Sequence, residues 1–217
     1  MQPASDELAT LLDVTAGTGE ASKVAVADSS GGHAFVGRLT TTDGVASGTA
    51  KVIGGRAYSN TAASAAHTNT TTEALFDTTY SIPANTLKAG TVVRIKYQGI
   101  ATSTNSTDTL TIKLYLGGLA GTALLTGTAT DVANDNIFAG EFTLVIRTAG
   151  ASGTMVGYGT HTEVPAASGT AAHDITEILA STTVDTTAAQ VVGVGADWSV
   201  ANAGNSARLD VMIVEIY

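Results

Sequence analysis

The sequence predicts an all-β protein, an antiparallel β-sandwich of jelly-roll-like type preceded by an extended N-terminal arm. Three observations predict it. Thr, Ala and Gly are abundant while charged residues make up only 13%, apolar and polar side chains alternate with a period of two in many short segments, and Gly, Asn, Asp or Ser separate these segments. Thr is stiff at χ1 and Gly loses backbone entropy in a helix, so both suit strands and turns. The regular spacing of the segments is typical of a sandwich rather than of a βαβ fold.

Three parts are expected along the chain: an arm over residues 1–56, a linker over 57–72 and the β-sandwich over 73–217. In the arm, a leucine cluster with 3–4 spacing fits one or two helical turns, too few to be stable alone. Two valines that alternate with alanine then predict a brief strand. The linker lacks periodicity and reads as a surface segment. The arm residues concerned are Leu8, Leu11, Leu12, Val14, Val24 and Val26.

Nine strands are predicted in the sandwich. The alternation is clearest in the second, where Val93 and Ile95 face inward and Arg94 and Lys96 face outward. In the eighth, Trp198 shares a face with three apolar residues, which favours a core anchor over a stacking platform for a sugar or base. The predicted ranges are Glu73–Tyr80, Thr91–Ala101, Asp108–Leu116, Ala123–Thr128, Ile137–Thr148, Thr154–Val164, Ile175–Ser181, Gln190–Ala201 and Ala207–Tyr217.

The last strand is apolar on both faces, since one face carries Leu209, Val211 and Ile213 and the other Met212, Val214 and Ile216. A sandwich strand with one wet side would not show this pattern. Either the arm or a neighbouring subunit is expected to cover the second face, and the subunit is favoured. The candidate subunit or capsid contacts are therefore Leu8, Leu11, Leu12, Val14, Val24, Val26, Met212, Val214 and Ile216.

Charge and composition exclude several classes of function. The net charge is −9 and the ten Lys and Arg residues are scattered, so no nucleic-acid partner is expected. The absence of Cys excludes a disulfide framework, a thiolate zinc site and a cysteine nucleophile. No apolar run approaches the roughly 18 residues that span a bilayer, so no membrane partner and no export signal are expected.

The candidate chemical motifs are weak. His161 and Glu163 share one strand face and His173 and Asp174 follow a short loop later, so a metal site or an acid–base pair is conceivable, but exposed polar residues are the favoured interpretation. The oxygen-rich segment Asp131–Asn136 lacks the pattern of a calcium loop and is read as a turn. No catalytic, cofactor-binding or metal-binding residue is assigned, no cofactor is expected, and the chain is predicted not to be an enzyme.

Several segments resemble structural proteins of tailed-bacteriophage particles. Ser81–Gly118 resembles a module in which an "IPANTL-x-x-G" loop leads into a strand with alternating basic residues and then "TDTLTIKLYLGG". Gly140–Thr154 (GEFTLVIRTAGASGT), Asp185–Trp198 and Asn202–Glu215 resemble later parts of the same module. The phrase VTAGTGEASKVAVAD in the arm looks like one found in head-decoration and fibre proteins.

The resemblance implies a non-enzymatic virion protein, made in the host cytoplasm and placed on the capsid surface. A resemblance to decoration (cement) and head-fibre proteins implies that the chain binds the major capsid protein. It also implies that the chain associates with itself as a homotrimer. The alternative is a tail-fibre or receptor-binding module that contacts host surface saccharide. Aromatic residues make up only 5% of the chain, which favours decoration because saccharide sites use exposed aromatic clusters. A virion glycan hydrolase would need a converging acidic pair that no motif places.

Overall fold

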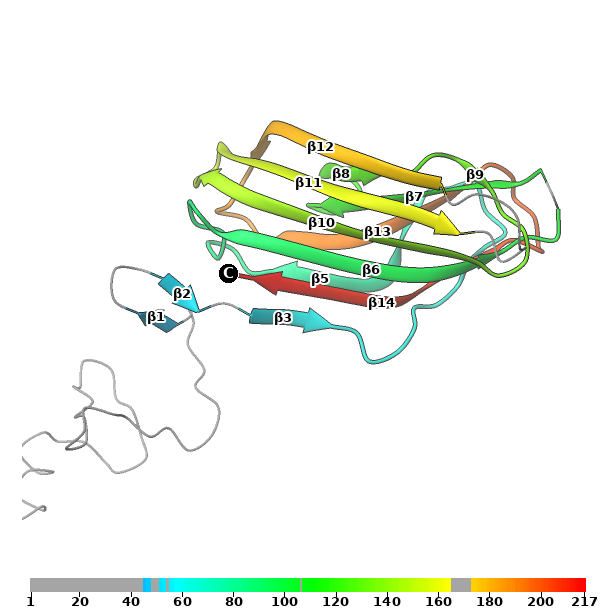
Figure 1. Ribbon diagram of the computed structural model, residues 1–217, viewed down its shortest axis with the longest axis horizontal. Helices are drawn as coiled ribbons and strands as arrows, with labels where there is room; N and C mark the ends of the chain where they lie inside the picture. Colours follow the sequence, from blue (N-terminus) through cyan, green and yellow to red (C-terminus); the bar gives the residue numbers. More distant parts are fainter. Residues whose placement is uncertain (1–44, 48–50, 54, 106, 165–172) are drawn as a thin grey trace, which may run out of the picture. The chain divides into compact units, whose positions relative to one another are not determined.

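The computed structural model describes residues 45–47, 51–53, 55–105, 107–164 and 173–217. Its sandwich is built from two antiparallel sheets, as predicted (Figure 1). The described residues contain no helix that is long and apolar enough to cross a membrane. The strands are β1 (Val45–Ser47), β2 (Lys51–Ile53), β3 (Gly55–Ser59), β4 (His67–Thr68), β5 (Ala74–Ile82), β6 (Val92–Thr102), β7 (Thr109–Leu116), β8 (Thr122–Thr126), β9 (Thr130–Asp131), β10 (Asn136–Thr148), β11 (Gly153–Val164), β12 (His173–Val184), β13 (Gln190–Trp198) and β14 (Ser206–Ile216).

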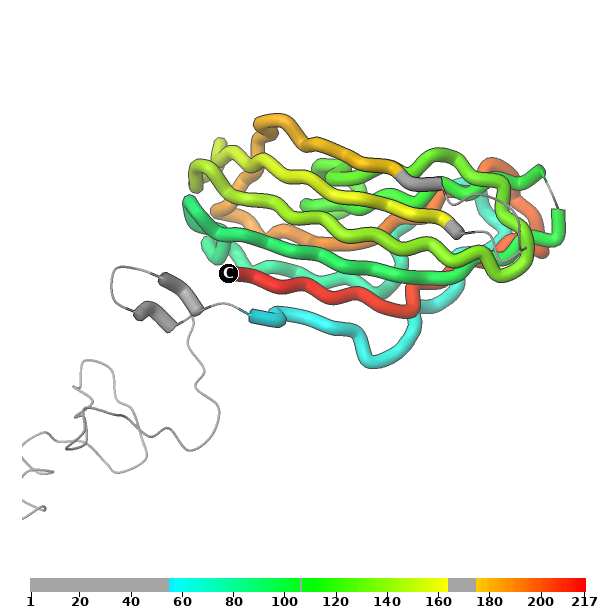
Figure 2. Tube along the Cα trace, viewed as in Figure 1, coloured from blue at the N-terminus to red at the C-terminus, as the bar shows by residue number. Residues whose placement is uncertain are grey.

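The two layers bring strands from distant parts of the chain side by side. The seven-stranded sheet has the order β12-β11-β10-β6-β14-β3, with β4 also pairing with β14, and the five-stranded sheet has the order β5-β13-β7-β8, with β9 pairing with β7. Figure 2 shows β14, in red, between the green β6 and the cyan β3. The pair of short strands β1 and β2 forms a separate two-stranded hairpin.

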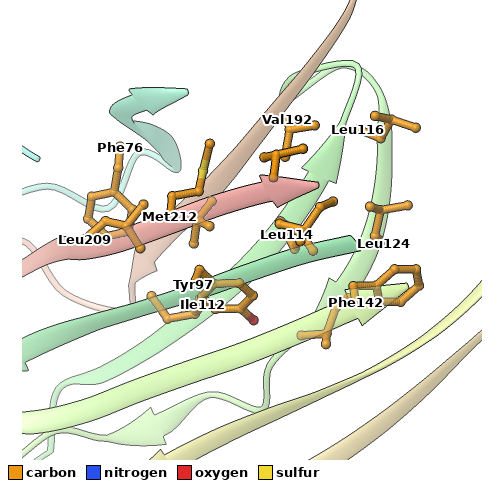
Figure 3. Packing of buried hydrophobic residues seen from close by; sticks show 14 of the residues in the cluster. Phe76, Tyr97, Ile112, Leu114, Leu116, Leu124, Phe142, Val192, Leu209 and Met212 are labelled. Carbon is orange, nitrogen blue, oxygen red and sulfur yellow. The ribbon is translucent and has the colours of Figure 1, made fainter. Parts of the chain in front are cut away.

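The core lies between the two sheets, because the long strands of both sheets turn apolar side chains inward (Figure 3). Val93, Ile95 and Phe142 from one sheet pack in the same cluster as Ile112 and Leu114 from the other. Trp198 is 1% exposed and its indole N–H donates to the carbonyl of His67 at 3.4 Å. Its prediction as a core anchor is confirmed.

All nine predicted strands are present, with ends shifted by at most a few residues. Of the five further short strands among the described residues, β1, β2, β3, β4 and β9, two pair with β14: β3, at the junction of the predicted arm and linker, and β4, in the predicted linker. They are short and polar, so periodicity cannot reveal them; the edge of the sheet positions them through backbone hydrogen bonds. Gly55, the first residue of β3, lies opposite Ile216 near the end of β14.

An extra residue in β14 explains why this strand is apolar on both faces. The register runs from Leu209↔Gly99 directly to Val211↔Gln98, so Asp210 is unpaired in a β-bulge. A bulge reverses the alternation of the residues that follow it. Leu209 before the bulge and Met212 after it therefore both face the core, whereas Val211 between them is 37% exposed.

One end of the sandwich is fastened by a buried carboxylate. The side chain of Asp108 is fully buried and accepts hydrogen bonds from the amides of Asn105 (3.0 Å), Asn202 (3.1 Å) and Asn205 (3.0 Å). Ser103 donates to Asn205 at 2.8 Å. Buried polar groups are stable when fully hydrogen-bonded, so this network joins the β6–β7 loop to the β13–β14 loop.

Candidate functional site

Of the residues predicted as subunit or capsid contacts, three lie within the described part of the chain and six do not. Met212 and Val214 are fully buried and Ile216 packs against the core, so the assignment of these three to a subunit or capsid contact is corrected: the bulge at Asp210 turns them inward. Leu8, Leu11, Leu12, Val14, Val24 and Val26 lie outside the described residues. An apolar residue of β14 that does face outward is Val211, which is 37% exposed.

The broadest candidate contact surface is the outer face of the seven-stranded sheet, defined here as the outward side chains of β14, β6, β10, β11 and β12. Tyr158 of β11 is 64% exposed and Ile178 of β12 is 78% exposed, and the two residues are opposite each other in the register. Ile137 of β10 is 43% exposed on the same face. Apolar groups this exposed in a sheet are typical of contact surfaces when they occur together.

Charged residues cross the middle of this outer face. Arg94 lies 3.9 Å from Glu215, and Lys96 lies 3.8 Å from Glu141. The outward direction of Arg94 and Lys96 is as predicted. Exposed pairs at such distances contribute little to stability because solvent and salt screen them. They are therefore available to exchange partners when another surface docks.

A second candidate site lies inside the sandwich, where Tyr97, His161 and Glu163 form a hydrogen-bonded chain, named here the inner triad. The Tyr97 hydroxyl lies 2.9 Å from His161 Nδ1, and His161 Nε2 lies 3.1 Å from Glu163 Oε1. His161 is fully buried, Tyr97 is 2% exposed and Glu163 is 4% exposed. Burial, and then the nearby Glu163 carboxylate, raise the pKa of the Tyr97 hydroxyl. The expectation that His161 and Glu163 are exposed is therefore wrong.

The residues around the inner triad seal it from solvent. A side chain at Gly127 would meet the His161 ring at 3.1 Å, and one at Gly140 would overlap the Tyr97 ring. The inner triad links a hydroxyl, a histidine and a carboxylate in the same order as the groups that activate a nucleophile in hydrolases. No substrate atom could reach the tyrosine oxygen in this packing, so the arrangement serves the core. The signal that could have revealed it is the inward row of β11, in which Met155, Gly157 and Gly159 precede His161.

A third polar group, named here the outer triad, lies on the outer face of the five-stranded sheet. Glu73 receives hydrogen bonds from Lys113 at 2.7 Å and from the Tyr115 hydroxyl at 2.6 Å. Partial burial would raise the pKa of Glu73, but these two bonds outweigh it and lower that pKa. The bond to Glu73 raises the pKa of Lys113. The two side chains closest to Gly195, Glu73 and Tyr115, fill the space that a side chain there would occupy.

The remaining histidines were the other candidates for a metal site. In the parts of the chain that the structure describes, no group of three or more His, Asp or Glu side chains could hold an ion. His67 lies in β4, where burial lowers its pKa although Asp197 opposes this. His33 and the side chains of His173 and Asp174 lie outside the described residues. The segment Asp131–Asn136 forms a turn with Asp135 at positive φ, as predicted.

Comparison with models of known protein families finds no match, and comparison with curated proteins finds none at a significant level.

Proposed function

We propose that the protein is a non-enzymatic structural protein of a tailed-bacteriophage particle, a capsid decoration protein that binds the assembled head through the major capsid protein and stabilises it. The observation that carries this proposal is the position of the phage-like segments in the fold. Ser81–Gly118 contains β6, Gly140–Thr154 covers most of β10, and Asn202–Glu215 covers most of β14. These strands are consecutive neighbours in the seven-stranded sheet.

The phage-like segments also contain β7 and β13, which are neighbours in the five-stranded sheet, so the resemblance covers adjacent strands in both sheets. Strands β10, β6 and β14 also carry the middle of the outer face, including Lys96, Glu141 and Val211. Residues that face the core maintain the fold, whereas residues that face outward determine which partner binds. The outer face combines exposed apolar side chains with paired opposite charges, a composition that suits a surface that docks on a protein lattice.

A protein that binds only the assembled lattice stabilises that lattice by mass action. In the same proposal the N-terminal segment, including Leu8, Leu11 and Leu12, contributes a further contact with the capsid.

The test mixes the purified full chain with expanded, undecorated capsids and with unassembled capsid protein. Binding to the capsids alone, together with a higher capsid melting temperature, is the expected result. A matched variant without Met1–Gly32 is expected to bind more weakly, and Val211→Lys tests the outer face. Failure of the full chain to bind any capsid would overturn the proposal, and equal binding by the truncated chain would remove the arm from it.

The second candidate, a tail-fibre or receptor-binding module, has one observation in its favour. Tyr158 presents its ring to solvent at 64% exposure, and exposed aromatic rings stack on sugars. A glycan-binding screen of the full chain with Tyr158→Ala as control separates the two functions. Saccharide binding that the Tyr158→Ala change abolishes would replace decoration by receptor binding.

A further inference from the structure

Strand β12 forms the outer edge of the seven-stranded sheet (Figure 1). This twelve-residue strand pairs with β11 on one side, and in the described ranges no strand pairs with its other side. An edge strand carries a row of unpaired N–H and C=O groups, which is a template for another strand. The opposite edge of the sheet is formed by two short strands, β3 with five residues and β4 with two.

The part of β12 that precedes its bulge, Ile175–Leu179, lacks the Lys and Pro residues that usually blunt an edge. Natural edge strands are short, or carry Lys, Pro or a bulge that stops pairing. The segment Ile175–Ala180 contains no Lys, Arg or Pro, and Glu177 is its one charged residue. An irregularity in the pairing with β11, opposite Val156, follows at Ala180 and Ser181. The regular part of the edge therefore ends at Leu179, directly after Ile178.

Ile178 is the most exposed large apolar side chain among the described residues, at 78%. It extends the row that begins with Tyr158 on the neighbouring strand. A strand added to β12 would continue this row and would cover the isoleucine. The occupant must therefore offer a free edge and an apolar side chain at the matching position.

We propose that the occupant is β12 of a second copy of this chain, paired antiparallel about a two-fold axis at Ile178. In this register Ile178 lies opposite Ile178 of the second copy, and the outer row reads Tyr158, Ile178, Ile178, Tyr158 across four strands. Aromatic and β-branched pairs of this kind stabilise neighbouring strands. The contact is isologous and closes after two copies.

The same register separates the like charges. Glu177 lies opposite Leu179 of the second copy, whereas a shift that centres the axis on Glu177 would place two carboxylates opposite each other. Like charges directly opposite are unfavourable in a sheet. Only registers that keep both sandwiches on the same side of the joined sheet preserve the inward direction of Leu179, which packs against the core. Among these, pairing about Ile178 covers the most exposed apolar area.

The chain contains no Cys, so a single introduced cysteine reports this contact without background. Ile178→Cys is expected to form a disulfide-linked dimer under mild oxidation, because opposite residues have Cβ atoms about 4.5–5.5 Å apart. Tyr158→Cys is the matched control. Its two copies would be three strand spacings apart, roughly 14 Å, and are expected to stay unlinked.

Sedimentation of the unmodified full chain tests the association itself. The experiment involves no capsid, so its outcome is independent of the proposed function. The expected species is a dimer that Ile178→Lys dissociates, raising the dissociation constant at least about tenfold. Mixing Ile178→Lys with Ile178→Glu is expected to restore it. Leu119→Lys, at another exposed apolar residue, is the control that should remain dimeric.

The net charge of −9 on each copy opposes association at low ionic strength, so the dimer fraction is expected to rise with salt. A monomer at all salt concentrations, a trimer of the kind that the phage resemblance implies, or equal cross-linking at Tyr158→Cys would each overturn the proposal. Normal circular dichroism and melting of Ile178→Lys would show that dissociation does not come from unfolding.

Discussion

The inner triad and the outer triad contain nearly the same chemistry at different depths. Each combines a tyrosine, a glutamate and a basic side chain: Tyr97, His161 and Glu163 in the core, and Tyr115, Lys113 and Glu73 on the surface. In the inner triad His161 is fully buried, whereas the side chain of Lys113 is 21% exposed. Water can replace a lost partner only in the outer triad. Depth, rather than the groups involved, should therefore decide what each contributes to stability.

The largest effect is expected for His161→Ala. This change leaves the Tyr97 hydroxyl and the Glu163 carboxylate buried without their partner and opens a cavity, so the free energy of unfolding should fall by about 3–5 kcal/mol. Urea denaturation measures it. A loss below about 1 kcal/mol would mean that water reaches the inner triad, and the comparison with the outer triad would fail.

Replacing the whole inner triad tests whether the loss in His161→Ala comes from buried polar groups left without partners. In Tyr97→Phe combined with His161→Leu and Glu163→Leu, no polar group is left unpaired, so the loss should be smaller than for His161→Ala alone. The triple variant and the three single variants are unfolded side by side. Additive losses would contradict the interpretation that the single variants suffer from orphaned groups.

The glycines beside the two triads give the next largest difference. A Cβ atom at Gly127 would lie 2.9 Å from the backbone carbonyl of Ile112 and 3.1 Å from the sealed His161 ring, so Gly127→Ala should cost about 1–3 kcal/mol. At Gly195 the nearest atoms, at 3.2 Å, belong to the Glu73 and Tyr115 side chains, which can shift. Gly195→Ala is the matched control and should change stability by less than about 0.5 kcal/mol. Equal losses would show that the surface is packed as rigidly as the core.

A small effect is also expected for Glu73→Gln, about 0.5 kcal/mol at neutral pH because solvent screens the outer triad. The pKa of Glu73 is lower in the folded protein than its ordinary value of 4.5. Its contribution is therefore present above pH 4.5 and is lost as the pH falls through the lowered pKa. Unfolding of both proteins between neutral pH and pH 3 measures this. A difference that grows on acidification would contradict the sign.

The sequence predicts the strands well because alternation reports directly which side chains face the core. It cannot locate the bulge at Asp210, since one extra residue leaves the composition of β14 unchanged and only reverses the faces beyond it. The pattern then suggests a covering subunit where the structure has a single buried face.

The burial of His161 escaped prediction for a different reason. Polar residues on a strand are mostly exposed, and the partner that makes burial tolerable, Tyr97, lies 64 residues away in the sequence. Spacing along β11 alone contains no information about a hydroxyl on β6. The outer triad was missed in the same way, because Glu73 and Lys113 meet only through the pairing of the five-stranded sheet.

The antiparallel pairing of Gly55 with Ile216 has a mechanical consequence. The start of β3 and the end of β14 lie side by side, so tension applied to these two points would peel β3 from β14 one hydrogen bond after another. Strands pulled in this direction lose their hydrogen bonds one at a time. They resist the applied force far less than strands that must slide past each other. Under stretching, the sandwich would thus yield first at β3, and the inner strands would keep their pairing until that edge had been removed.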